Sequence, residues 1–161
     1  MIRITLESET DTLLELAIST GVFKPLEIDA LREVLDDYHD GNHQYHHKAF
    51  TYEENGRPIG FAYFAPIDMT DRSWILYWIF VGKEIQAKGV GTRLLTHVEN
   101  ELRLAGARIF LIETSALPSY EPTRRFYLKH GYEIAGTIRD FYSDGDDQVI
   151  FRKRISQAAI D

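Results

Sequence analysis

The sequence predicts an α/β fold in which a mixed central sheet of about seven strands is flanked by about four helices. Two observations carry this prediction. Short apolar or alternating segments are typical of strands, and longer segments with apolar residues three or four positions apart are typical of helices. These segments follow the order βααβββαβαββ, in which a three-stranded meander leads into alternating strands and helices. That order is typical of a sheet with both antiparallel and parallel pairs.

The first half of the chain is predicted to form a strand, two helices and a hairpin. Alternating apolar residues predict the strand, Gly21 ends the first helix, and Pro25 precedes the second. Asn55-Gly56 is typical of a hairpin turn. The predicted elements are residues 2–6, 10–20, 26–38, 49–52 and 59–64.

The second half is predicted to alternate strands and helices. Residues 74–81 are rich in β-branched and aromatic side chains, as in a buried strand, and Gly106 and Gly131 are placed to end two helices. The predicted elements are residues 74–81, 90–105, 108–114, 122–130, 132–142 and 148–154. In the helix at 90–105, an apolar face carries Val90, Leu94, Leu95, Val98 and Leu102, and the solvent faces carry Arg93, Glu99, Glu101 and Arg103.

Length and composition predict one cytoplasmic domain. The 161 residues with their 44% hydrophobic fraction suit a single core, so we expect one domain over residues 1–161. The chain has no cysteine, carries acidic residues early, and has no apolar run of membrane-spanning length. The net charge of -7 disfavours nucleic acid and anionic membranes as partners and favours a cationic acceptor such as an amine. The oligomeric state stays open, with a homodimer as one option.

A glycine-containing loop, Gln86-Ala87-Lys88-Gly89-Val90-Gly91, stands between the strand at 74–81 and the helix at 90–105. At the start of a helix, unpaired backbone N–H groups and the positive end of the dipole favour a phosphate. Two glycines without side chains let that phosphate approach the backbone. The loop is therefore predicted to hold a pyrophosphate, with a plain strand-to-helix turn as the alternative.

Two motifs resemble those of the GCN5-related N-acetyltransferase (GNAT) family. The loop matches Gln/Arg-x-x-Gly-x-Gly/Ala, and Phe126-Tyr127-Leu128-Lys129-His130-Gly131-Tyr132 is similar to the family's helix ending in Phe/Leu-Tyr-x-x-x-Gly-Phe/Tyr. The resemblance implies a GNAT-like sheet and acetyl-CoA as the acetyl-donating cosubstrate. It also implies direct acetyl transfer, through a ternary complex, to a primary amine of a peptide, a protein or a small molecule. Two alternatives stay open: a catalytically silent coenzyme A-binding sensor or interaction module, and a transferase for a larger acyl group.

The resemblance also implies which residues bind the donor. Backbone groups of the strand end would pair with the pantetheine arm as an added strand, and backbone groups of the loop would hold the pyrophosphate, with Gln86 shaping the loop's entry. Lys88 and Arg93 would add positive charge. Many relatives have an asparagine where this chain has Tyr120, and Ser119 and Arg125 are the alternative contacts there. The implied donor-binding residues are Ile79, Phe80, Val81, Gln86, Ala87, Lys88, Gly89, Val90, Gly91 and Thr92.

Two residues are candidates for proton transfer. Tyr127 has the position of the family's tyrosine that protonates the coenzyme A sulfur, and its alternative role is that of a core aromatic residue beside Phe126. Glu113 follows an apolar run, where partial burial would make it a better proton acceptor, and the resemblance to N-terminal acetyltransferases implies a base there. The alternative for Glu113 is a solvated or salt-bridged carboxylate near Arg108 or Arg124, with water removing the proton.

The hairpin at residues 139–147 is predicted to face the acceptor. Phe141 and Tyr142 resemble part of the tyrosine-bearing hairpin by which N-terminal acetyltransferases cover a peptide. One or more of Asp144, Asp146 and Asp147 would attract the positive charge of an amine. An ordinary acidic turn is the alternative.

A group of histidines precedes the hairpin at 49–64. Their spacing lacks a completing carboxylate or cysteine pattern, so we expect a polar loop and no metal. The histidines are His39, His43, His46 and His47.

Overall fold

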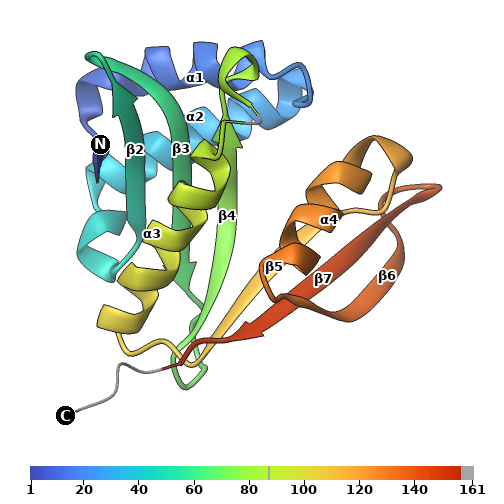
Figure 1. Cartoon of the computed structure of the whole chain (residues 1–161). Helices are drawn as coiled ribbons and strands as arrows, with labels where there is room; N and C mark the ends of the chain where they lie inside the picture. Colours follow the sequence, from blue (N-terminus) through green and yellow to red (C-terminus); the bar gives the residue numbers. More distant parts are fainter. Residues whose placement is uncertain (87, 157–161) are drawn as a thin grey trace. The chain divides into compact units, whose positions relative to one another are not determined.

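The computed structural model describes residues 1–86 and 88–156 (Figure 1). Within these ranges, seven strands form one sheet in the order β1-β2-β3-β4-β5-β7-β6, and four α-helices accompany it. The order of elements along the chain is the predicted βααβββαβαββ, so the α/β fold is confirmed. The strands are β1 (Ile2–Ile4), β2 (Lys48–Glu54), β3 (Arg57–Pro66), β4 (Ser73–Val81), β5 (Ile109–Ser115), β6 (Glu133–Ser143) and β7 (Asp146–Arg154). The helices are α1 (Thr10–Ser19), α2 (Pro25–Asp40), α3 (Val90–Leu104) and α4 (Glu121–Lys129).

The chain divides into two compact units. The first comprises Met1–Pro66 and Trp78–Glu101, and the second comprises Ile67–Tyr77 and Leu102–Asp161. The division falls within β4 and α3, so each unit receives part of both elements. The single domain expected over residues 1–161 stays a prediction.

In the first unit, helices cover both faces of the strands (Figure 1). Leucines of α1 and α2 share a core with Ala49, Phe61 and Tyr63 on one face. Phe50 follows Ala49 and therefore points to the other face. There the ring of His97, from α3, lies 4.5 Å from the Phe50 ring.

The apolar face of α3 is buried as predicted, with one error at its margin. The predicted face residues are at most 3% exposed. Glu99 was expected in solvent but is 7% exposed. Glu99 lies four residues after Leu95 and three before Leu102, so it shares the flank of the apolar face.

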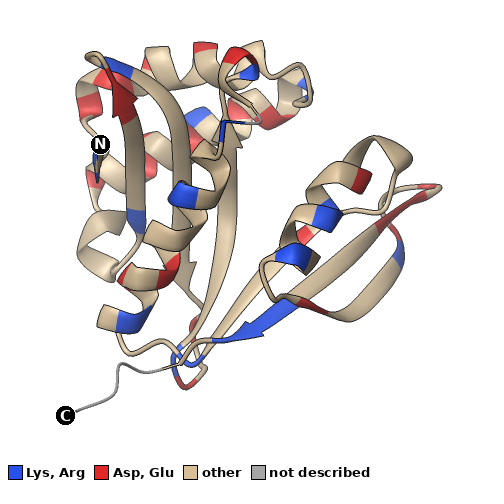
Figure 2. Cartoon of the chain, viewed as in Figure 1, with Lys and Arg blue, Asp and Glu red and all other residues tan. Residues whose placement is uncertain are grey.

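Acidic residues are concentrated on α1 and α2 (Figure 2). Residues 1–40 carry ten acidic and three basic side chains, a net charge of -7 that equals the net charge of the whole chain. The remaining residues are balanced between acids and bases. The negative charge of the protein is therefore a local property of its N-terminal helices.

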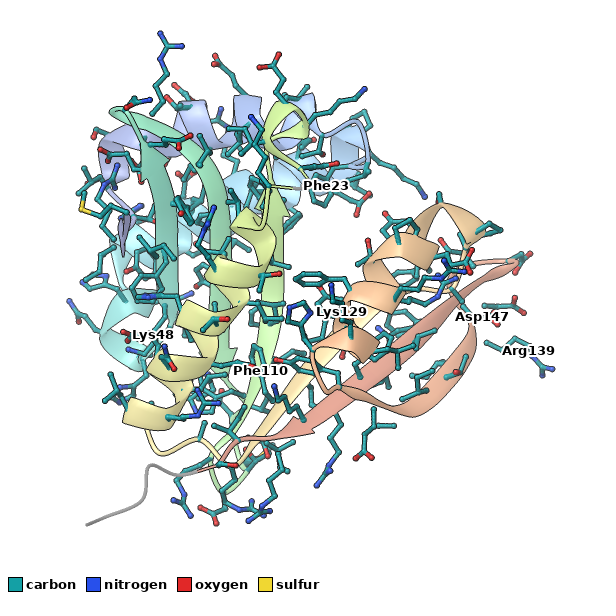
Figure 3. All side chains as sticks on the ribbon, in the orientation of Figure 1. Phe23, Lys48, Phe110, Lys129, Arg139 and Asp147 are labelled. Carbon is teal, nitrogen blue, oxygen red and sulfur yellow. The ribbon has the colours of Figure 1, made fainter. Side chains whose placement is uncertain are left out.

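In the second unit, α4 covers one face of β5 and β7. The ring of Tyr127, from α4, lies 5.5 Å from that of Phe151 in β7. The ring centroid of Tyr132, just after the helix, lies 6.4 Å from that of Phe110 in β5, and Figure 3 labels Phe110. β5 pairs in parallel with the first residues of β4, and β7 pairs antiparallel with both β5 and β6.

Candidate active site

The glycine loop of the first unit has the backbone geometry of a helix start. Gln86 donates from Nε2 to the carbonyl oxygen of Val81 at 3.3 Å, which ties the loop to the end of β4. Gly89 has φ +77°, and a Cβ there would meet no atom within 4 Å. α3 begins at Val90, and the Arg93 N–H donates to the Gly89 carbonyl oxygen at 3.1 Å. Among the described residues, the N–H groups of Val90, Gly91 and Thr92 precede this first helical hydrogen bond, and such groups can bind a ligand.

This geometry fits the pyrophosphate that the sequence predicts. A left-handed glycine with open space beside it and a helix N-terminus are what an anion needs. Arg93 donates from Nη2 to the Lys88 carbonyl oxygen at 3.2 Å, and its guanidinium lies 5.8 Å from the Tyr52 ring centroid. Arg93 therefore supports the loop backbone, while the Lys88 side chain is exposed. Ala87, also predicted as a contact, lies outside the described residues. The predicted contacts Val90, Gly91 and Thr92 belong to the first turn of α3.

The C-terminal end of β4 is an edge of the first unit. The parallel ladder between β4 and β5 ends at Leu76. Residues 78–81 belong to the first unit, and no strand of that unit in the described ranges pairs with them except β3. Phe80 is buried in the core, whereas Ile79 and Val81 are half-buried. Within this unit, the backbone of these residues offers the strand edge that pairing with an extended ligand requires.

Tyr127 of the second unit is buried among aromatic rings. Its side chain is 4% exposed, and its ring centroid lies 5.6 Å from Phe126, 5.9 Å from Tyr132 and 5.5 Å from Phe151. Within the part of the chain that the structure describes, no hydrogen bond engages its hydroxyl. Burial raises the pKa of this hydroxyl well above its ordinary value. Tyr127 therefore keeps its proton at neutral pH and can act as a donor.

Glu113 is exposed, and the partial burial expected for it is wrong. Alternation along β5 explains the difference, because the neighbouring Ile112 and Thr114 point to the opposite face and are buried. The Glu113 carboxylate accepts a hydrogen bond from Nε2 of Gln148 at 2.9 Å. Gln148, which is 2% exposed, was not singled out by the sequence because its position depends on strand register.

The two arginines considered as partners of Glu113 bind elsewhere. Arg124 donates from Nη1 to the Ser115 carbonyl oxygen at 2.8 Å. Arg108 donates from Nη1 to the Asp71 carbonyl oxygen at 2.7 Å. Among the described residues, neither forms an ion pair with Glu113, so the salt-bridge alternative is not supported.

Strand register puts Glu113 and Tyr127 on opposite faces of the sheet in the second unit. Phe151 is paired with Ile112 in the β5/β7 ladder, on the face that packs against Tyr127. Glu113 points to the other face, where it meets Gln148. The two candidates for proton transfer therefore lie on different sides of the same strands.

Phe141 and Tyr142 lie in an irregular stretch of β6. The β6/β7 ladder shifts register between Ile138 and Ser143. Both aromatic side chains are exposed, and their ring centroids lie 5.0 Å apart. The Tyr142 hydroxyl lies 3.4 Å from Nε2 of Gln148, so the bulge and Glu113 share one hydrogen-bonding partner.

The three aspartates of this hairpin differ in their roles. Asp146 is 6% exposed and accepts a hydrogen bond from the Ser115 hydroxyl at 2.5 Å. Asp147 accepts one from the Asp140 N–H at 2.9 Å. These two carboxylates stabilise the hairpin, whereas Asp144 is exposed and fits the predicted attraction of an amine.

Two of the histidines before β2 form hydrogen bonds with tyrosines. His43 Nδ1 lies 2.7 Å from the Tyr38 carbonyl oxygen, and His47 Nδ1 lies 2.7 Å from the Tyr63 hydroxyl. The segment expected as a loop contains a short 3-10 helix, Asn42–Tyr45. In residues 1–86 and 88–156, no group of three or more His, Cys, Asp or Glu is placed to hold a metal.

Tyr120 ends a short 3-10 helix just before α4. Arg125 donates from Nη2 to Glu121 Oε1 at 2.9 Å, and Ser119 is exposed. Ser119 and Arg125 stay predictions as alternative donor contacts.

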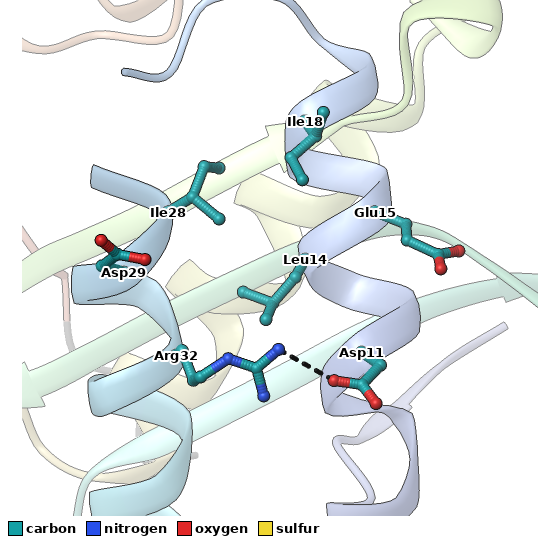
Figure 4. A pocket seen from close by; sticks show the side chains of 7 residues that line it. All are labelled: Asp11, Leu14, Glu15, Ile18, Ile28, Asp29 and Arg32. Atoms are coloured by element: carbon teal, nitrogen blue, oxygen red, sulfur yellow. Dashed lines mark hydrogen bonds and ion pairs between the residues drawn. The ribbon is translucent and has the colours of Figure 1, made fainter. Parts of the chain in front are cut away.

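A groove lies between α1 and α2 (Figure 4). Arg32 donates from Nη2 to Asp11 Oδ1 at 3.0 Å across it, while Glu15 and Asp29 add negative charge. Three carboxylates against one guanidinium give this surface a negative balance. The lining residues are Asp11, Leu14, Glu15, Ile18, Ile28, Asp29 and Arg32.

Known proteins show the same sequence and fold features. Residues 12–132 match the acetyltransferase (GNAT) family. A crystal structure of a putative GNAT-family acetyltransferase from Desulfovibrio desulfuricans is 31% identical, covers 97% of this chain and 99% of that chain, and has a TM-score of 0.92. The ribosomal-protein-S18-alanine N-acetyltransferase from Escherichia coli shares the fold at 19% identity, with 99% and 96% of the two chains covered and a TM-score of 0.78. An uncharacterized N-acetyltransferase of Methanocaldococcus jannaschii is 32% identical over 75 residues, which are 46% of this chain and 47% of that relative, about half its length.

The chain belongs to the acetyltransferase (GNAT) family. It is an acetyltransferase by this membership, and acetyl-CoA is the donor that the family uses. Among its described helices, none is both long and apolar enough to cross a membrane.

Proposed function

We propose that the protein transfers an acetyl group from acetyl-CoA directly to a primary amine while both are bound. The observation that carries this proposal is the glycine loop, in which Gly89 has a left-handed backbone with open space beside it and α3 begins at Val90. Aminolysis of a thioester requires that a proton leaves the amine and that another reaches the departing sulfur. Glu113 and Tyr127 are the candidates for these two proton transfers, and they lie on opposite faces of β5 and β7. No covalent enzyme intermediate is needed, which agrees with a chain without cysteine.

The first unit supplies the donor contacts in this proposal. Backbone N–H groups of the loop and of the first turn of α3 bind the pyrophosphate, and Gly89 leaves room for it. Gln86 holds the loop to Val81, and the backbone of Ile79 to Val81 pairs with the pantetheine arm. When bound, acetyl-CoA supplies the thioester that the amine attacks.

The second unit supplies the proton transfers. Tyr127 is the general acid: it is protonated at neutral pH, and donation becomes favourable as negative charge develops on the sulfur. Glu113 is the general base, held by Gln148 on the other face. Its exposure also supports the alternative in which a water molecule carries the proton from the amine.

The acceptor in this proposal is an amine that reaches the protein as a cation, gives up its extra proton to solvent, and attacks as the neutral amine. The net charge of -7 on residues 1–40 attracts cations from a distance, and Asp144 adds charge at the hairpin. Phe141 and Tyr142 form an aromatic wall against the acceptor. An exposed wall suits a peptide or protein amine, and a small-molecule amine remains the alternative.

We further propose one domain over residues 1–161, because the family match at residues 12–132 runs through both units. A cytoplasmic location, without nucleic-acid or membrane partners, agrees with the cysteine-free acidic composition. A homodimer stays open. Retention of Tyr127 with a hydroxyl free to donate favours catalysis over a silent coenzyme-binding module.

The test is the release of free thiol from acetyl-CoA in the presence of amines, peptides and polyamines. Tyr127→Phe removes only the hydroxyl and keeps the ring packing, so we expect kcat to fall about 10²- to 10⁴-fold. Coenzyme binding and the free energy of unfolding should stay nearly unchanged. Tyr132→Phe is the matched control, because its ring lies 5.9 Å away in the same aromatic cluster; its kcat should stay near that of the wild type.

The outcomes separate the alternatives. Coenzyme binding without turnover on any acceptor would establish the silent module. Absence of coenzyme A binding would contradict the whole proposal. A Tyr127→Phe variant with wild-type kcat would remove Tyr127 as the acid, and a Glu113→Gln variant with wild-type kcat would assign proton removal to water.

A further inference from the structure

Gln148 is a buried polar residue that joins two parts of the candidate site. It lies in β7, between β5 and β6, and is 2% exposed. Its Nε2 donates to Glu113 Oε2 at 2.9 Å and to the Tyr142 hydroxyl at 3.4 Å. An ionised carboxylate only accepts hydrogen bonds, so the amide nitrogen must be the atom that faces Glu113.

Strand register makes this contact possible. Gln148 is paired with Ser115 in β5 and with Ile138 in β6. Glu113 is two residues from Ser115 on the same face, a diagonal separation that two long side chains can bridge. Gln148 also pairs with the last regular residue of β6 before the ladder shifts. It therefore stands where the bulge carrying Tyr142 begins.

The bulge is held by its own hydrogen bonds. Asp140 has φ +56°, its N–H donates to Asp147 Oδ1 at 2.9 Å, and its Oδ1 accepts the Gly145 N–H at 2.8 Å. These contacts fix the hairpin end, whereas residue Tyr142 is 45% exposed. The amide of Gln148 contacts both the Tyr142 hydroxyl and the Glu113 carboxylate, and so relates the position of one to the other.

We propose that Gln148 is a positioning residue that holds the Glu113 carboxylate and the Tyr142 hydroxyl in one arrangement toward the acceptor. This inference rests on the proposed function, because it assigns the acceptor side of the same reaction. Gln148 acts through its two partners and does not itself exchange a proton. Its loss should lower turnover through Glu113 and weaken acceptor binding through Tyr142.

The first test uses Gln148→Met, which keeps the length of the side chain and removes the amide donor. We expect kcat to fall about tenfold or more and the acceptor KM to rise, with the KM for acetyl-CoA unchanged. In a Glu113→Gln background, adding Gln148→Met should lower kcat little further, because the base that Gln148 positions is already absent. Ile150→Val is the matched control: Ile150 is paired with Glu113 in the ladder but offers no side-chain hydrogen bond, so kcat should stay near wild type.

The second test measures the hydrogen bond without activity. Gln148→Glu puts a second carboxylate against Glu113 and should lower the melting temperature more than Gln148→Met. The double variant Glu113→Gln with Gln148→Glu exchanges donor and acceptor, so its melting temperature should recover. It should not regain turnover, because the residue at 113 is then no longer a base.

The two proposals fail in different ways. A wild type without acetyl transfer to any amine contradicts the proposed function and the positioning role with it, whatever the melting temperatures show. An active wild type with unchanged kinetics in Gln148→Met contradicts the positioning role alone. Purely additive losses of kcat in the double variant, or no thermal recovery in the exchanged pair, also overturn it. Non-additive kinetics together with thermal recovery support it.

Discussion

Replacing Gly89 by alanine separates the backbone cost of the glycine loop from its role in binding the donor. Gly89 has φ +77° with open space beside it, so an added methyl group meets no atom and only backbone strain remains. That strain costs about 1–2 kcal/mol for an L-residue. Gly56, in the hairpin turn, has the same φ of +77° and also has open space. Gly56→Ala is therefore a control with matched strain.

The two variants should lose similar stability and differ in coenzyme A binding. At Gly89 the methyl group would stand where a phosphate approaches the helix N-terminus. Loss of one hydrogen bond to a charged group costs about 1.5–3 kcal/mol, or roughly a 10- to 150-fold weaker Kd.

Urea unfolding gives the stability of each variant, and titration calorimetry with coenzyme A gives the Kd. Gly56→Ala should bind coenzyme A like the wild type. If Gly89→Ala did the same, the loop would not be the pyrophosphate site.

Two further predictions concern stability. Gly82→Ala should cost about 1 kcal/mol, because its Cβ would come within 2.8 Å of Leu16 Cδ1 and the end of that side chain must move aside. Gly136→Ala, in open space, should cost nothing or stabilise slightly in the same urea assay. Equal losses of stability in the two variants would refute the packing argument. Burial tends to raise the pKa of Glu9, but hydrogen bonds and the charge of Arg3 outweigh it and hold the pKa below 4.5. The pKa of Glu9 is thus lower in the folded protein than in the unfolded chain. As pH falls through 4.5, the unfolded chain takes up the proton first, so the free energy of unfolding decreases until pH reaches the folded pKa. Glu9→Gln should lower the free energy of unfolding by about 2 kcal/mol at pH 7. Unfolding measured at several pH values should show a weaker loss of stability toward acid pH in this variant. An unchanged slope of stability against pH would contradict the role given to Glu9.

The sequence predicts the order of elements because periodicity and turn chemistry are local. The observed boundaries differ from the predicted ones by at most two residues. The Asn55-Gly56 turn is a clear case, since both residues have positive φ, at 51° and 77°, as a two-residue hairpin turn requires. Glu99 shows where local patterns fail to predict burial. Whether a residue at the margin of an apolar helix face is buried depends on what packs beside it.

The sequence predicts the candidate site only in part, because sequence patterns are local and the packing of distant segments is not. The glycine loop and Tyr127 stand in contiguous motifs, so the sequence locates them without knowledge of the sheet. The exposure of Glu113 depends on which face of β5 is covered by α4. The separate roles of Asp144 and Asp146 depend on whether Ser115 of another strand reaches them.

By itself, the sequence determines the element order, the family motifs and the local concentration of negative charge in residues 1–40, because each is encoded by neighbouring residues. Only the tertiary structure decides which face each candidate occupies and that Gln148 meets Glu113. Those two residues are 35 positions apart, and their contact follows from the pairing of β5 with β7. A shift of one residue in that pairing would turn Gln148 to the opposite face, so the site depends on strand register.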